Sequence, residues 1–157
     1  MQRRLIVCND EDLRQVFKWF TDAGEVLKWG GPDLTFPLEL DRFKKESKHH
    51  KSQSFVLSSG SELLAFGQFY NRLERIHLGR LVVAPVFRGQ RLGEHLIEAL
   101  IDKGKVTLGL SDAALFVLSD NLPAMRLYRR LGFTEQPYPK PIPLANCIYM
   151  IRPQKPQ

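Results

Sequence analysis

The feature that most restricts the fold is a change of hydrophobic period between residues 76 and 118. Ile76–Ala84 is rich in apolar and β-branched residues, and the proline that follows it marks the end of a strand. In Gly93–Asp102 the apolar residues recur three and four positions apart, which predicts an amphipathic helix. Ala113–Leu118 is a continuous apolar run, typical of a strand buried on both faces. The order strand, helix, strand places this segment in the α/β class.

The remainder of the chain fits a mixed, mostly antiparallel sheet flanked by helices. Ser54–Ser58 and Leu63–Tyr70 flank a short Ser-Gly-Ser turn, which predicts an antiparallel hairpin. Further strands are predicted at Arg4–Cys8, Phe133–Gln136 and Ala145–Ile151, and further helices at Asp10–Phe20, Pro37–His49 and Leu122–Leu131. Glycines at 24 and 104 are interpreted as helix ends, and residues 29–32 as a loop. We expect one domain over residues 1–152 and a short C-terminal tail over 153–157.

Charge and composition exclude several classes of protein. The net charge of +6 permits a polyanionic partner, but the basic residues are spread along the chain, so we expect no nucleic-acid footprint. No apolar run approaches the roughly 20 residues of a membrane helix. Acidic residues follow the first short apolar stretch, so we expect no signal peptide and a cytoplasmic protein. Cys8 and Cys147 lie far apart without metal-ligand spacing, and we expect no metal.

A glycine-containing turn, Arg88-Gly89-Gln90-Arg91-Leu92-Gly93, lies between a predicted strand and a predicted helix. Such a turn directs successive backbone N–H groups to one point, and the helix adds its positive end, so the segment can bind a phosphate. The same pattern is also found in plain connections whose arginines are solvated. The Gly-Lys-Ser/Thr of a P-loop is absent, and the turn comes too late in the chain for a dinucleotide-binding fold.

Two motifs in this order resemble those of the GNAT acetyltransferases. The turn matches the phosphate-binding pattern Gln/Arg-x-x-Gly-x-Gly/Ala from Arg88 to Gly93, with Arg91 in place of the middle glycine. Arginine can take ordinary helical or turn dihedrals, but a positive φ there would be costly. About 30 residues later, Asn121-x-x-Ala-x-x-Leu-Tyr128-x-x-x-Gly-Phe133 matches the second signature in every fixed position. The resemblance covers residues 76–150 and implies the acyl-CoA N-acyltransferase fold.

The resemblance also implies a set of site residues and a cosubstrate, acetyl-CoA. In the family, strand backbone opened by a β-bulge holds the acyl carbonyl and the pantetheine amides, which corresponds here to Leu81, Val82 and Val83. The diphosphate would be bound by the turn and the first helical residue: Arg88, Gly89, Gln90, Arg91, Leu92, Gly93 and Glu94, the last through its N–H. Asn121 would hydrogen-bond the pantetheine arm, or cap a helix, or both. Tyr128 would contact the cosubstrate and protonate the departing thiolate as general acid.

The general base is not identified by the resemblance. Several related enzymes carry a glutamate five residues before the asparagine, where this chain has Phe116. Glu74 and His77 are possible substitutes, although residues of these types at a strand entrance are often only exposed. The acceptor is expected to be a small-molecule amine or an amine of a peptide or protein, bound near Trp19, Trp29, Phe36 or Tyr138. The positive net charge argues against polyamine acceptors.

The sequence therefore predicts an N-acetyltransferase that acts by direct attack in a ternary complex. A catalytically silent acyl-CoA-binding sensor module is the alternative, because the glutamate is missing and Arg91 departs from the motif. A basic nucleic-acid-binding domain has only the net charge in its favour. The sequence does not determine the oligomeric state; a homodimer is common among relatives and is the assembly that the resemblance favours.

Overall fold

A computed structural model describes residues 2–142 and 144–154, so the last three residues of the expected tail lie outside the described part. Seven strands form one sheet in the order β1-β2-β3-β4-β5-β7-β6. The strands are β1 (Arg3–Val7), β2 (Gln53–Ser59), β3 (Glu62–Arg72), β4 (Arg75–Val83), β5 (Ala113–Leu118), β6 (Thr134–Glu135) and β7 (Cys147–Arg152). The α-helices are α1 (Asp10–Phe17), α2 (Ala23–Gly30), α3 (Leu40–Glu46), α4 (Leu92–Leu108) and α5 (Leu122–Arg130), and two short 3-10 turns lie at His49–Lys51 and Pro85–Phe87.

The sheet is mixed, as predicted. Neighbouring strands run antiparallel except for β4 and β5, which are parallel. The predicted hairpin is formed by β2 and β3, with Ser59 opposite Glu62 beside the turn. The expectation of a mostly antiparallel sheet flanked by helices is therefore confirmed.

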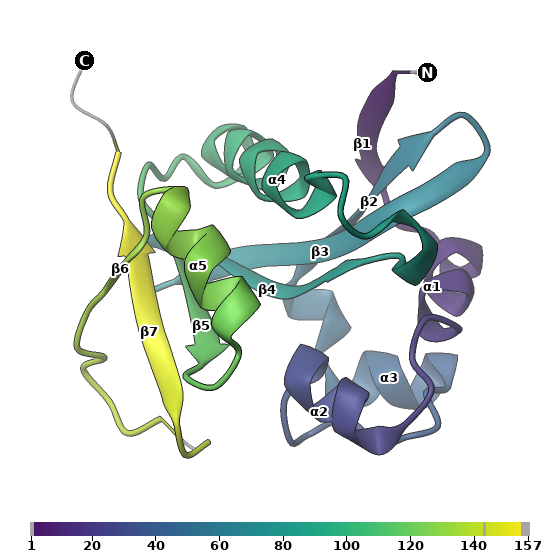
Figure 1. Ribbon diagram of the computed structural model, residues 1–157, viewed down its shortest axis with the longest axis horizontal. Coiled ribbons are helices and arrows are strands. Elements are labelled where there is room, and N and C mark those ends of the chain that lie inside the picture. Colours follow the sequence, from purple (N-terminus) through teal and green to yellow (C-terminus); the bar gives the residue numbers. More distant parts are fainter. Residues whose placement is uncertain (1, 143, 155–157) are drawn as a thin grey trace.

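The two parallel strands separate after a short contact, and this separation creates the site. β4 and β5 pair only from Ile76 with Ala113 to Leu78 with Leu115. Beyond that point β5 is paired with β7 along its whole length, while β4 continues its ladder with β3. Figure 1 shows the two halves diverging, with β5 and β7 on the left and β1 to β4 on the right. A wedge without a strand ladder therefore opens between Gly79–Val83 and Phe116–Leu118.

The helices cover the two faces of the sheet separately. α4 and α5 pack on one face through a core that includes Leu96, Leu100 and Met125. α1, α2 and α3 cover the other face of the β2–β4 half through a second core around Phe43 and Phe66. Figure 1 shows α4 above the sheet and α1 to α3 below its right half. The last turn of α2 lines the wedge together with β4 and β5.

Two of the predicted helix ends were wrong, one because of a helix cap and one because of packing against the sheet. Gly24 does not end a helix but lies in the first turn of α2, which Asp22 caps by accepting a hydrogen bond from the Glu25 N–H at 2.8 Å. α4 runs past Gly104 to a left-handed glycine, Gly109. Gly104 packs against β4, because an added Cβ would lie 2.6 Å from Ile76 Cγ2.

Within the described residues, no helix is both long and apolar enough to cross a membrane.

Candidate functional site

The turn before α4 presents a row of free backbone donors. In the part of the chain that the structure describes, the N–H groups from Gly89 to Glu94 donate no hydrogen bond to the protein; the first internal bond there is that of the His95 N–H to the Arg91 carbonyl. Gly89 has a φ of +85° and an ideal Cβ would meet nothing within 4 Å, so the backbone is open to an approaching group. Six free N–H groups at the positive end of a helix form an anion-binding arrangement.

Arg91 adopts the left-handed conformation that was expected to be costly, with φ 59° and ψ 25°. A non-glycine residue pays about 1 kcal/mol for this conformation. The side chains of Arg88 and Arg91 are both exposed beside the turn, so they can add positive charge there. The Glu94 carboxylate is directed to Arg130, at 3.3 Å, which leaves the Glu94 N–H as its contribution to the row of donors.

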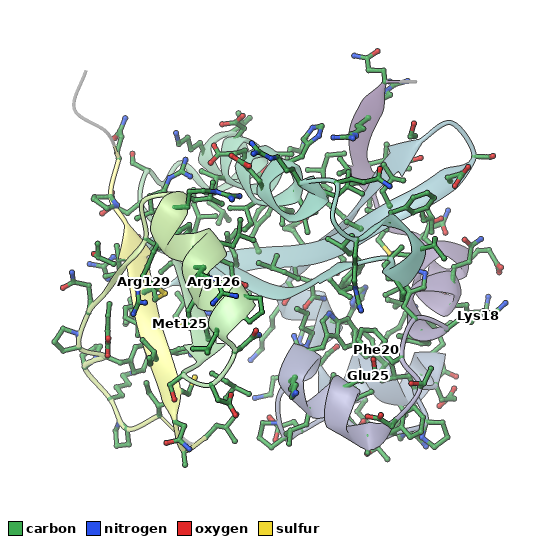
Figure 2. All side chains as sticks on the ribbon, viewed as in Figure 1. Lys18, Phe20, Glu25, Met125, Arg126 and Arg129 are labelled. Atoms are coloured by element: carbon green, nitrogen blue, oxygen red, sulfur yellow. The ribbon has the colours of Figure 1, made fainter. Side chains whose placement is uncertain are left out.

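A cleft of about 720 Å³ opens on this turn, and we call it the turn cleft. One side is formed by the turn and the start of α5, and the other by Phe20, Glu25 and Lys28. Figure 2 labels Phe20 and Glu25, near the start of α2, and Met125, Arg126 and Arg129, on α5. Ten of the expected site residues line this cleft, namely Leu81, Val82, Val83, Arg88, Gly89, Arg91, Leu92, Gly93, Glu94 and Asn121.

Two expected site residues lie elsewhere. Gln90 lines a separate depression together with Arg3 and Glu62, on the far side of the turn. Its backbone N–H still belongs to the row of free donors, so its expected role rests on the main chain alone. Tyr128 does not line the turn cleft but the neighbouring one, between β4 and β5.

The β-bulge of β4 lies one position earlier than the expected Leu81–Val83 segment. Val82 pairs with Phe66 and Gly79 with Gln68, so Arg80 and Leu81 together face the single residue Gly67. Gly67 has no side chain to obstruct Leu81, and an added Cβ would lie 2.9 Å from Leu81 Cδ2. The bulge bends β4 away from β5 at the point where their pairing ends.

Trp29 anchors the bulge from outside the sheet. Its indole N–H donates to the Arg80 carbonyl at 2.8 Å, and its ring stacks on Phe43 with centroids 5.7 Å apart. Trp29 was expected on a loop, but it lies in the last turn of α2. The two glycines that follow, Gly30 and Gly31, suggested a loop, but in the structure they form the end of α2.

The wedge between β4 and β5 contains a second cleft of about 570 Å³, which we call the wedge cleft. Tyr70, Phe116 and Tyr138 form an aromatic wall, Tyr128 also lines this cleft, and Asn121 borders both clefts. Of the aromatic residues expected around an acceptor, Trp29 and Tyr138 line the wedge cleft. The other two, Trp19 and Phe36, instead pack against the core under α1 to α3.

Tyr128 and Asn121 are positioned by α5. Asn121 caps the helix by accepting from the Ala124 N–H at 3.4 Å, so the capping interpretation holds, and the residue also borders both clefts. The Tyr128 ring packs beside Phe133, with centroids 6.0 Å apart. Burial raises the pKa of its phenol to about 12, so this side chain keeps its proton at neutral pH.

His77 lies at the base of the wedge cleft, whereas Glu74 lines neither cleft. Glu74 is exposed in the turn between β3 and β4. His77 is 2% exposed and stacks among Tyr70, Phe116 and Tyr149. Burial, with a smaller effect of the Arg72 charge, lowers its pKa to about 3, so the imidazole is neutral at pH 7.

Sequence reasoning missed two arginines in the wedge cleft. The Arg72 guanidinium lies 5.3 Å from the ring centroids of both Tyr70 and Phe116 and donates to the Tyr138 hydroxyl at 3.1 Å. Arg80 donates to Gln68 Oε1 at 2.9 Å. A charged residue inside an apolar strand was the available signal, since Arg80 stands between Leu78 and Leu81.

Comparisons with known proteins agree with this arrangement. The family model described as "Acetyltransferase (GNAT) family" matches residues 13–133. A Schizosaccharomyces pombe protein described as an uncharacterized N-acetyltransferase is 44% identical over 73 residues, which are 45% of this chain and 43% of that protein. The spermidine N(1)-acetyltransferase of Escherichia coli is 25% identical over 127 residues, which are 79% of this chain and 68% of that enzyme. The first of these alignments thus spans less than half of the relative.

Two solved structures share the fold over nearly the whole chain. The spermidine N-acetyltransferase of Vibrio cholerae, in complex with CoA and spermine, superposes with a TM-score of 0.75 at 19% identity. The alignment covers 98% of this chain and 96% of that one. The ribosomal-protein-S18-alanine N-acetyltransferase of Escherichia coli gives 0.69 at 22% identity, over 99% and 96% of the two chains. At these identities the likeness establishes the common fold.

Proposed function

Because the chain belongs to the acetyltransferase (GNAT) family, we propose that it transfers the acetyl group of acetyl-CoA to a primary amine by direct attack in a ternary complex. The single observation that carries the proposal is the row of six unpaired N–H groups from Gly89 to Glu94, open to the turn cleft. A diphosphate is the anion that such a row binds, and the exposed Arg88 and Arg91 add charge beside it.

The pantetheine arm would run from the turn cleft into the wedge between β4 and β5. The backbone of Leu81–Val83 lines this route on the edge of β4 that has no strand partner. An extended amide-containing arm can pair with such an edge as an added strand would. Asn121 borders both clefts and has an amide group left for the arm in addition to its helix cap. The thioester would then lie at the junction of the clefts, near Tyr128.

The chemistry requires an oxyanion donor and a general acid. The amine nitrogen attacks the thioester carbonyl, a C–N bond forms, and the carbonyl oxygen becomes negative in the tetrahedral intermediate. A backbone N–H of the bulged β4 segment would stabilise this oxygen, an effect often worth about 3 kcal/mol. The C–S bond then breaks, and the neutral Tyr128 phenol gives its proton to the departing thiolate. Tyr128 recovers a proton from solvent.

The surplus proton of the attacking amine would leave through water. Phe116 occupies the position at which several relatives have a glutamate. Among the described residues that line the wedge cleft, Asp33 is the one carboxylate, and His77 is neutral and almost wholly enclosed. The enzyme would therefore accept an amine that is already deprotonated, and its rate should rise with pH until that amine is neutral.

A turnover screen with acetyl-CoA over small amines and peptides tests the proposal, with thiol release as the readout. Replacement of Tyr128 by Phe should lower kcat by about 100-fold or more, the usual contribution of general acid catalysis, and leave CoA affinity nearly unchanged. Tyr149→Phe is the matched control, because Tyr149 is buried and lines neither cleft. Acetyl-CoA binding without transfer to any amine would instead indicate a sensor module.

A further inference from the structure

The wedge cleft has a strongly one-sided charge. Among its described lining residues the cations are Lys28, Arg72, Arg80 and Lys140, and the one carboxylate is Asp33. A cleft with this balance raises the local concentration of anions and repels polycations. The relatives named for spermidine act on a polycation, so the charge of this cleft argues for a different acceptor here.

Two of the cations are held inside the cleft without an ion pair, although the more distant Asp33 carboxylate attracts Arg80. In the described part of the chain neither Arg72 nor Arg80 forms an ion pair with a carboxylate. Arg80 Nε is buried and has no hydrogen-bond partner, and burial lowers the pKa of this guanidinium. A partly desolvated guanidinium without an acceptor is unfavourable, so the site favours a ligand that supplies one.

The same fold neutralises a third half-buried arginine in the usual way. The side chain of Arg152 is 14% exposed, and both of its terminal nitrogens donate to the Glu98 carboxylate. Within the described residues Arg72 and Arg80 have no such ion pair. Arg75 also has a buried Nε without a partner, but it lies outside the wedge cleft, so what sets Arg72 and Arg80 apart is that they line a cleft.

Both guanidinium groups are held in place by contacts that leave donors free. Arg72 lies near the Tyr70 and Phe116 rings, and one of its N–H groups donates to the Tyr138 hydroxyl. One N–H group of Arg80 donates to Gln68, and the Gln68 amide in turn donates to the Ser54 hydroxyl at 2.9 Å. Since a guanidinium has five N–H groups, each arginine retains donors for a ligand. Positioned guanidinium groups suit carboxylate and phosphate oxygens.

The anion cannot be the diphosphate that we assign to the turn cleft, because Arg72 and Arg80 do not line that cleft. The thioester end that would reach the wedge is uncharged. An anion in the wedge cleft must therefore come from the second substrate.

We propose that the acceptor is a small primary amine that also carries an anionic group, bound by Arg72 and Arg80, with its apolar part against the aromatic wall of Tyr70, Phe116 and Tyr138. The inference rests on the proposed acetyl transfer and names its substrate class. A cleft of about 570 Å³ has the size of a small-molecule site, which accommodates an amino-acid-like amine. A carboxylate and a phosphate would both satisfy the two arginines.

Matched series of acceptors test the charge requirement. Several amino acids are each compared with their methyl ester and their decarboxylated amine, phosphoethanolamine with ethanolamine, and spermidine is included. The anionic member should have a kcat/KM at least about tenfold above its neutral counterparts, the order expected for one charge-assisted hydrogen bond. The two series separate a carboxylate site from a phosphate site. A preference for neutral amines or spermidine would overturn the inference and leave the acetyltransferase proposal standing.

Arginine variants test the residues. Arg72→Gln and Arg80→Gln should each lower the preference for the anionic member about tenfold, with CoA affinity unchanged. Arg75→Gln is the matched control, because it removes the same charge from the same hairpin outside the cleft, and it should keep the preference. If a glutamine variant fails to fold, Arg→Lys retains the charge but loses the fork of donors, and should still weaken the preference.

A binding measurement keeps the inference testable if no amine is acetylated. 3-Phenylpropionate, which has an anionic group but no amine, is titrated calorimetrically into the CoA-loaded protein. Binding that is lost in Arg72→Gln and Arg80→Gln would support the anion site even if transfer failed. Absence of binding, or binding unaffected by both variants, would refute it.

Discussion

Replacement of His77 by Phe should make the protein less sensitive to acid. His77 is 2% exposed, and its ring centroid lies 4.9 Å from that of Phe116 and 5.1 Å from that of Tyr70. Phenylalanine preserves these ring contacts and removes the titratable group. The nearby cation is Arg72, which also opposes a charge on the imidazole.

The magnitude follows from the two pKa values of the histidine. Burial lowers the pKa in the folded protein from 6.5 to about 3. Between these values the unfolded chain binds one more proton than the folded one, so stability is complete above 6.5 and decreases as the pH falls toward 3. The slope is about 1.4 kcal/mol per pH unit. Between about pH 7.5 and about pH 5, His77 alone should cost roughly 2 kcal/mol of unfolding free energy.

Urea unfolding at these two pH values, followed by tryptophan fluorescence, measures the effect. The wild type should lose about 2 kcal/mol more than His77→Phe between the two conditions, whatever the difference between them at neutral pH. Tyr149→Phe, which changes the same aromatic cluster but retains the histidine, should follow the wild type. Equal losses for wild type and His77→Phe would show that the buried imidazole accepts a proton freely, and the reasoning from burial would be refuted.

Three further substitutions test the packing of the site. Gly104→Ala should lower the unfolding free energy by about 1–2 kcal/mol, because contact with Ile76 outweighs the gain in helix propensity, and a more stable variant in urea would contradict this. Gly89→Ala should cost about 1 kcal/mol through its positive φ, since the added methyl meets nothing; an unchanged urea midpoint would show that the turn adapts. Trp29→Phe leaves the Arg80 carbonyl without its indole donor and should lower the unfolding free energy by about 1–3 kcal/mol in the same assay. A variant as stable as the wild type would contradict this.

The sequence was sufficient for the elements whose signal is local. The hairpin of β2 and β3, the buried strand β5 and the start of α4 follow from hydrophobic period and from turn residues, which act over a few positions. The turn at Gly89 was predicted for the same reason, because a strand, a glycine and an amphipathic helix in succession prescribe its geometry. The pattern of Leu122–Leu131 predicted a helix that contains Tyr128 and has Asn121 near its start, and the structure has both residues there.

Element ends were predicted less well, because distant residues decide them. Glycine often ends a helix, yet α4 continues through Gly104. Ile76 of β4 packs directly on this position, and a side chain there would collide with it. Trp29 precedes two glycines and was assigned to a loop, but its indole bonds a carbonyl fifty-one positions away and its ring joins the core of α3. Because the partners are far apart in the sequence, the local hydrophobic pattern could not indicate either contact.

The character of the wedge cleft belongs to the tertiary structure alone. The bulge opposite Gly67 and the early end of β4–β5 pairing decide that a cleft exists there at all. Arg72 and Arg80 lie on different strands, and only the hairpin brings them to the same cleft. The sequence determines the net positive charge of the chain. The electrostatic field in the cleft also depends on the distances between charges and on their burial, and the fold determines both.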